Sequence, residues 1–171
     1  MSDVTRVDGE LTPVDGRWQL RFRRRLAHPP EKVWRALVEP EHLAAWFPQR
    51  VVGERAAGAR LRFEHDQSGT DAFDGEMLRF EPPRLLEFTW GPDVLRFELE
   101  PDGDHTVLTL FDTFDAEGKA ARDAAGWHEC LDRLAAHVDG RPLGAWGAPW
   151  PELNDAYVAR FGPEAATIGP P

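Results

Sequence analysis

The sequence has very little cysteine and no long apolar run. A single cysteine, Cys130, among 171 residues excludes an internal disulfide and any zinc site built from several cysteines. No segment approaches the roughly 18 consecutive apolar residues that a membrane-spanning helix needs, and the first ten residues contain no apolar stretch of the kind that a secretory signal carries. From these absences we expect a cytoplasmic protein without a membrane span.

Positive charge is also scarce. Twenty lysines and arginines stand against 30 aspartates and glutamates, which gives a formal net charge of -10 at pH 7. Because such a surface repels phosphates, we expect no nucleic-acid partner. The one basic cluster, in residues 21–25, alternates partly with apolar side chains, and this pattern predicts the solvent face of an edge-like strand whose charges discourage aggregation.

Apolar and polar residues alternate in most of the chain, and this period of two predicts half-buried antiparallel strands. The first run covers residues 18–26, and further runs follow between turn residues at 60–64, 73–80, 86–90, 95–99 and 105–114. In residues 73–80 the apolar side chains change parity, so we expect a β-bulge near Met77.

Helical patterns interrupt and follow this series of strands. Two short helices are predicted after the first strand, beginning at Pro30 and Pro40, because proline suits the first turn of a helix. One long amphipathic helix is predicted from about Ala116 to Gly140, a natural C-terminal cap. We expect one domain over residues 1–140, with its core at 18–139, and an aromatic-rich extension over 141–171 whose short helix docks on the same domain.

This order of elements resembles the helix-grip architecture of the SRPBCC, or START-like, superfamily. The sequence HPPEKVWRAL at residues 28–37, followed by PEHLAAWF at 40–47 and by Gly126, Trp127 and Leu131, is similar to the branch named after the activator of the ninety-kilodalton heat-shock protein's ATPase. The resemblance implies an α+β fold with a curved antiparallel sheet of about six or seven strands wrapped around the long C-terminal helix. In many relatives the space between sheet and helix holds apolar ligands.

Large apolar side chains are expected to face one another across that space. Aromatic rings would give it rigid walls and methionine an adaptable one. The ligand-binding residues that we predict are Trp46, Phe73, Met77, Phe88, Trp90, Phe97, Trp127 and Leu131. The alternative is a close-packed core, because native interiors pack near the density of organic crystals. Gly126 is expected to let the long helix approach the sheet closely.

The sequence contains few candidates for catalysis or metal binding. Its six histidines show no recognised metal spacing, and we expect no metal and no other cofactor. Cys130 lies on the apolar stripe of the long helix and is expected to be an inert core residue. Asp112 and Asp115 flank the end of the last strand, where Asp112 could act as a general base and Asp115 is the expected helix cap.

Three functions remain open at this level. The first is non-catalytic binding of a small apolar or amphipathic molecule between the long helix and the curved sheet. The second is an interaction module of co-chaperone type, with a protein partner or a homodimer. The third is a cyclase- or hydrolase-like enzyme that uses Asp112 or the imidazole of His128 inside the pocket.

Overall fold

The computed structural model describes residues 7–65 and 72–168. Within these residues, one eight-stranded sheet has the order β1-β2-β8-β7-β6-β5-β4-β3, and every neighbouring pair is antiparallel. The strands are β1 (Glu10–Val14), β2 (Arg17–Leu26), β3 (Arg50–Val52), β4 (Arg60–Glu64), β5 (Phe73–Glu81), β6 (Leu85–Trp90), β7 (Asp93–Asp102) and β8 (His105–Phe114). The register between β5 and β6 shifts between Met77 and Arg79, which confirms the predicted bulge.

The α+β helix-grip fold is confirmed, with more strands than the six or seven expected. The two additional strands, β1 and β3, are the edges of the sheet and have five and three residues. Three residues are too few to display an alternation, and β1 contains Pro13, which a sheet tolerates at an edge because proline offers no N–H to the ladder. Sequence periodicity is therefore weakest where the sheet ends.

The basic cluster does not lie on an edge strand, so that part of the prediction is wrong, but Arg21, Arg23 and Arg25 are exposed, as predicted. Strand β2 pairs with β1 on one side and β8 on the other. Three of the four arginines of the cluster form ion pairs within the chain: Arg21 contacts Glu10 at 2.7 Å, Arg24 contacts both Asp8 and Asp132 at 2.7 Å, and Arg25 contacts Asp102 at 2.8 Å. These contacts join β2 to neighbouring elements.

Proline marks the start of the first two helices. Helices α1 (Pro30–Val38) and α2 (Pro40–Trp46) both have proline in their first turn, as predicted. The long helix α3 (Ala120–Val138) follows a short 3₁₀ turn, η1 (Glu117–Lys119), and ends before Gly140, whose φ of 70° is the left-handed conformation of a glycine cap. No helix in the described part of the chain is both long and apolar enough to cross a membrane.

The prediction that Asp115 caps the long helix is wrong. Asp115 lies outside the helical turn that opens with η1, and that turn has no side-chain cap. Its carboxylate instead accepts a hydrogen bond from Arg17 Nε at 2.7 Å. The sequence could not anticipate this because Arg17 is far away along the chain.

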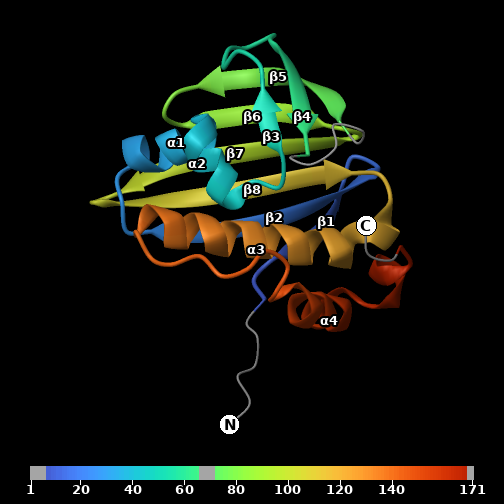
Figure 1. The fold of residues 1–171 in the computed structure, drawn as a ribbon. Coiled ribbons are helices and arrows are strands. Elements are labelled where there is room, and N and C mark those ends of the chain that lie inside the picture. The colour runs from blue at the N-terminus through green and yellow to red at the C-terminus, as the bar shows by residue number, and fades with distance from the viewer. Residues whose placement is uncertain (1–6, 66–71, 169–171) are drawn as a thin grey trace.

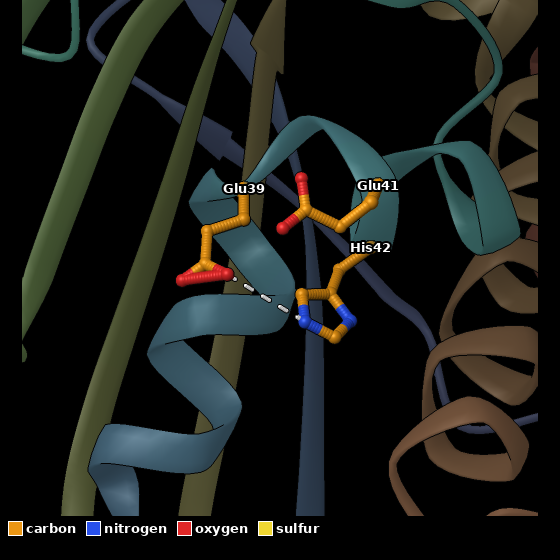
Figure 2. A group of neighbouring side chains, drawn as sticks. All are labelled: Glu39, Glu41 and His42. Atoms are coloured by element: carbon orange, nitrogen blue, oxygen red, sulfur yellow. Dashed lines mark ion pairs between the residues drawn. The ribbon is translucent and has the colours of Figure 1, made fainter.

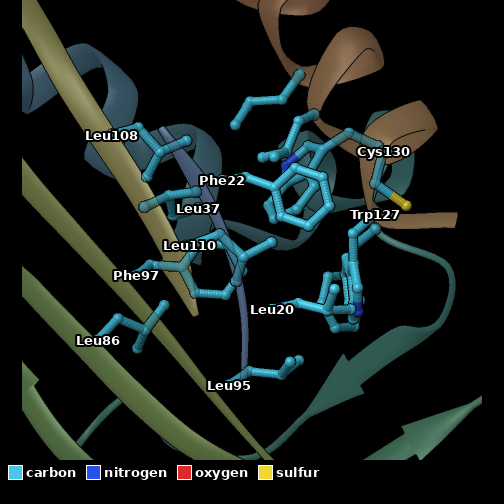
Figure 3. Close-up of a cluster of buried hydrophobic side chains, with 14 of the residues drawn as sticks. Leu20, Phe22, Leu37, Leu86, Leu95, Phe97, Leu108, Leu110, Trp127 and Cys130 are labelled. Atoms are coloured by element: carbon cyan, nitrogen blue, oxygen red, sulfur yellow. The ribbon is translucent and has the colours of Figure 1, made fainter. Parts of the chain in front are cut away.

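One hydrophobic core joins the sheet to the helices. Helix α3 lies along the β2 and β8 side of the sheet, α1 and α2 lie over its middle strands, and Figure 1 shows α4 (Trp150–Phe161) on the side of α3 away from the sheet. Leucines and phenylalanines of the strands meet Trp127 and Cys130 of α3 in this core (Figure 3). Burial of this apolar surface is the main force that holds α3 against the sheet.

The tail helix α4 contacts both the long helix α3 and the N-terminal segment at Gly9. Leu153 and Tyr157 are buried against α3. The Tyr157 hydroxyl accepts the Gly9 N–H at 3.1 Å and lies 2.7 Å from Nδ1 of His128, while Arg160 Nε donates to the Gly9 carbonyl at 2.9 Å. A short 3₁₀ turn, η2 (Pro163–Ala166), follows. The extension thus packs on the body of the fold, and its treatment as a part separate from residues 1–140 remains a prediction.

Candidate ligand-binding site

The space between α1, α2 and the sheet is nearly filled. The cavity there measures about 20 Å³, which is room for about one water molecule. Trp46, Met77, Phe88 and Phe97 surround it, and the ring centroid of Phe97 lies 5.9 Å from that of Trp46 and 6.2 Å from that of Phe88. In this region the chain has the close-packed interior that was the alternative to a cavity.

A much larger space lies beside α3, where the helix meets the segment 141–149 and the start of α4. Its volume is about 440 Å³. We call it the tryptophan pocket, and the residues that line it are Pro48, Gln49, His65, Trp90, Lys119, Arg122, Asp123, Gly126, Trp127, Glu129, Cys130, Trp146, Gly147 and Trp150.

Indole rings make up much of the apolar wall of this pocket. The rings of Trp90 and Trp127 meet edge to face with their centroids 5.2 Å apart. The Trp90 indole N–H donates to Gln49 Oε1 at 2.9 Å, and the guanidinium of Arg133 lies 4.0 Å from the ring centroid of Trp146. The hydrogen bond and the cation–π contact hold these rings in place and leave their apolar parts to face the pocket.

Paired charges form the polar end of the pocket. Lys119 Nζ lies 2.7 Å from Asp93 and 3.3 Å from Asp123, and Arg122 Nε donates to Asp123 at 3.0 Å. Burial would lower the pKa of Lys119, but the hydrogen bond to Asp93 and the charges of Asp123 and Asp93 outweigh it and raise this pKa. The amine therefore stays protonated and is unsuited to act as a nucleophile.

Gly126 leaves open space in the tryptophan pocket because it has no side chain. A Cβ built at this position meets no atom within 4 Å, so the expectation that Gly126 brings α3 close to the sheet is wrong. Glycine in the interior of a helix destabilises it by about 1 kcal/mol relative to alanine. What the missing side chain gives is room, because Gly126 lines the tryptophan pocket.

The predicted ligand-binding residues do not line one common cavity. Trp90 and Trp127 line the tryptophan pocket, Phe73 packs between the rings of Phe63 and Trp90, and Leu131 is buried in the core. The others surround the filled interior. A ligand role for any of the eight remains a prediction.

Several pocket residues were missed from the sequence: Gln49, Lys119, Asp123, Trp146 and Trp150. The unusual number of aromatic residues in the tail was a signal for Trp146 and Trp150, and the sequence contained no signal for the other three residues.

The two candidate catalytic groups lie outside the tryptophan pocket. His128 is buried on another side of α3, where Nδ1 lies 2.7 Å from the Tyr157 hydroxyl, and it does not line the tryptophan pocket. Asp112 is buried behind Trp127 and accepts the indole N–H at 3.1 Å. Cys130 is a buried thiol, as predicted, and burial raises its pKa, which makes it a poor nucleophile.

The histidines show one arrangement that their spacing did not reveal. His42 Nδ1 lies 2.8 Å from His137 Nε2, although 95 residues separate the two in sequence. On its other side, His42 Nε2 lies 3.7 Å from a carboxylate oxygen of Glu39, with Glu41 nearby (Figure 2). Side-chain exposures of 36% for His42 and Glu39 place this group on the surface, where acidic residues commonly gather without a metal. We assign no site to it.

The comparisons with known proteins agree with this architecture. The family model described as "Activator of Hsp90 ATPase homolog 1-like protein" matches residues 27–139. No curated protein matches the chain.

Solved structures resemble most of the chain. EF2215 from Enterococcus faecalis, a protein of unknown function, is 20% identical over 89% of both chains with a TM-score of 0.74. CalU16 from Micromonospora echinospora is 24% identical over 94% of this chain and 96% of its own, with a TM-score of 0.70. DynU16, described as a protein in the dynemicin biosynthetic locus, is 27% identical over 78% of this chain and 51% of its own, with a TM-score of 0.64.

Proposed function

The chain belongs to the family of Activator of Hsp90 ATPase homolog 1-like proteins, and on that basis we propose that it binds a small, neutral, largely aromatic molecule in the tryptophan pocket without transforming it. The proposal keeps the class of function expected from the sequence. It moves the ligand from the filled interior of the grip to the space beside α3 that the end of β6 and residues 146–150 also line.

Volume is the first argument for this pocket. Sites for small organic ligands commonly measure 300–1,000 Å³, and the tryptophan pocket measures about 440 Å³. The space beneath Trp46 measures about 20 Å³, which is too small for any organic ligand unless the core opens.

The character of the walls defines the ligand. Trp90, Trp146 and Trp150 offer partly exposed ring surfaces on which a planar apolar molecule can stack, and Trp127, which is 3% exposed, supports the wall from beneath. The charged side chains at the polar end already pair with one another, so a charged ligand would have to break existing ion pairs. A neutral aromatic molecule with one or two hydrogen-bonding groups fits both conditions.

Gly126 is the single observation on which the proposal most depends. A glycine in the middle of the long helix lowers helix stability, and no neighbouring atom requires it. A glycine at this position is explained if the space next to it must stay open for a ligand.

The two other functions predicted from the sequence have less support. The predicted enzyme would use Asp112 or His128, yet neither lines the pocket, because Asp112 lies behind Trp127 and His128 faces α4. For a protein partner, the described residues offer five exposed large apolar side chains on four separate segments, at Val52, Leu78, Leu143, Trp146 and Ile168.

Binding of the neutral aromatic dye N-phenyl-1-naphthylamine tests the proposal. The wild-type protein is expected to bind one dye molecule, with increased dye fluorescence and quenching of tryptophan emission. Gly126→Leu is expected to abolish binding, because its side chain occupies the open space of the pocket.

Gly144→Leu is the matched control. Gly144 also has no atom within 4 Å of a built Cβ, but it does not line the pocket. This variant should bind the dye like the wild type. Equal binding by Gly126→Leu and wild type, or no binding by the wild type, would refute the proposal.

A further inference from the structure

A group of three carboxyl groups lies at the polar end of the tryptophan pocket, with Asp93 and Asp112 buried behind the wall and Asp123 partly buried in it. Asp93 begins β7, Asp112 lies on β8 and Asp123 on α3, and one carboxylate oxygen of each lies within 4.8 Å of the others. Lys119 Nζ contacts both oxygens of Asp93, at 2.7 and 2.9 Å. Strands and helix are therefore joined here by polar contacts inside a mainly apolar core.

Asp112 is the most enclosed member of this group, with 0% of its surface exposed. Its Oδ2 accepts the indole N–H of Trp127 at 3.1 Å. Its Oδ1 is buried and has no hydrogen-bond partner among the described residues, and a carboxylate oxygen of Asp93 lies within 4.8 Å of a carboxylate oxygen of Asp112. Two ionised carboxylates only repel each other, so this contact becomes favourable when a proton lies between them.

The cations of this group pair with the other two carboxylates. Lys119 forms ion pairs with Asp93 and Asp123, and Arg122 forms one with Asp123. Among the described residues Asp112 forms no ion pair, so the enclosed carboxyl group has no positive charge in contact with it. A proton on Asp112 removes the cost of burying a charge there.

We propose that Asp112 is a neutral carboxylic acid, which donates its proton to Asp93 and accepts the indole N–H of Trp127, and that it thereby positions Trp127 in the wall of the tryptophan pocket. Asp112 is a positioning residue, because Trp127 lines the pocket and Asp112 does not. Only the consequence for ligand binding rests on the function proposed above. The protonation of Asp112 stands independently of it.

The charged groups that face Asp112 are Asp93 from β7, Asp123 from α3 and Lys119 from η1. Burial, followed by the negative charges of Asp93 and Asp123, raises the pKa of Asp112 well above its ordinary value, and Lys119 offsets only part of this. The folded state therefore holds a proton that the unfolded chain releases above about pH 4. Stability from this group is present at low pH and is lost as pH rises toward the folded-state pKa.

Asp112→Asn tests the proposal, because an amide reproduces the neutral acid: its oxygen accepts from Trp127 and its NH₂ donates to Asp93. Urea unfolding is measured from pH 4 to pH 8. The midpoints of variant and wild type should agree near pH 4, and the variant should become the more stable as pH rises. Infrared spectra of the folded wild type at pH 7 should contain the C=O band of a protonated carboxyl group, and Asp112→Asn should lack it.

Asp93→Asn is the matched control at a neighbouring buried aspartate. Asp93 is the ionised partner of Lys119, so its replacement should lower the unfolding midpoint at pH 7, opposite in sign to Asp112→Asn. If Asp112→Asn is instead less stable than wild type at pH 7 and the infrared band is absent, Asp112 is ionised and the proposal is wrong. A gain in wild-type stability with Mg²⁺ or Ca²⁺ that Asp112→Asn abolishes would also overturn it, in favour of a cation site.

The consequence for the pocket is measured with the same dye. Asp112→Asn should keep the wild-type dissociation constant, whereas Asp112→Ala should weaken binding about fivefold, the typical value of one hydrogen bond, because Trp127 loses its acceptor. Equal affinity of both variants would refute the positioning role. If the wild type binds no dye, the proposed function fails, and the infrared and unfolding results still decide the state of Asp112.

Discussion

Two buried tryptophans of this protein, Trp46 and Trp127, border spaces of very different size. Trp46 is 1% exposed and lies among the rings of Phe47 and Phe97, and the cavity beside it measures about 20 Å³. Trp127 lines a pocket of about 440 Å³. Aromatic side chains alone therefore do not make a binding site, because rings that can approach one another fill the space between them.

Polar contacts distinguish the surroundings of the tryptophan pocket, the open region, from the filled interior around Trp46, the closed region. In the closed region Trp46 donates to a backbone carbonyl, that of Ala36, at 2.8 Å, and its neighbours are apolar. In the open region the walls are held by side-chain hydrogen bonds, such as Trp127 to Asp112 and the Gly147 N–H to Glu129 at 2.6 Å. These hydrogen bonds keep the opposite walls of the tryptophan pocket apart. Because Gly126 has no side chain, the space between the walls stays open.

The largest expected effect is in the closed region. Phe97→Ala should lower the free energy of unfolding by about 3–5 kcal/mol, the usual loss for a buried phenylalanine, because the void cannot close around the remaining rings. Urea denaturation measures this loss. A loss below about 1 kcal/mol would mean that the interior is already loosely packed, and the contrast between the two regions would disappear.

Tyr157→Phe comes next and tests how firmly the tail helix is attached. The hydroxyl group satisfies the Gly9 N–H and contacts His128, so its removal leaves a buried donor without a partner and should lower the free energy of unfolding by about 1–3 kcal/mol. The exposed Asp155→Ala variant of the same helix is the control and should change little. Identical denaturation curves for Tyr157→Phe and wild type would show that these hydrogen bonds are not maintained in solution.

A smaller effect of opposite sign is expected at Gly126. Gly126→Ala should raise the free energy of unfolding by about 0.5–1 kcal/mol, because alanine favours the helix and its methyl group meets no neighbour. Thermal or urea unfolding measures the gain. Destabilisation would show that the space beside the helix is closed in solution.

The smallest effect on stability is expected from Trp146→Ala. Trp146 is 47% exposed, so its removal should change the free energy of unfolding by less than about 0.5 kcal/mol, although it is part of the pocket wall. Binding of the neutral dye should weaken in the same variant. A large loss of stability would assign Trp146 to the core and would remove the distinction between wall and interior.

Local signals in the sequence were sufficient for most of the fold. Alternating residues predicted β2 and β4 to β8, and prolines predicted where α1 and α2 begin. The change of parity predicted the bulge next to Met77. These features depend on side chains a few residues apart, which is the range over which periodicity and turn chemistry act.

The location of the open space could not be predicted in the same way. The sequence identified Trp46, Phe97 and Trp127 equally well as large apolar residues facing the sheet or the helix. Whether such residues touch depends on how far apart their elements lie, and that distance is set by contacts such as those of Asp112, Glu129 and Arg133 with partners elsewhere in the chain.

By itself, then, the sequence determined a curved antiparallel sheet with one long helix against it, because periodicity and turn residues are local properties. Only the tertiary structure decided that the interior is filled and that a pocket opens beside α3, with a pair of carboxyl groups behind its wall. The physical reason is that packing and charge pairing depend on the distances between side chains from separate elements, which exist only in the folded chain.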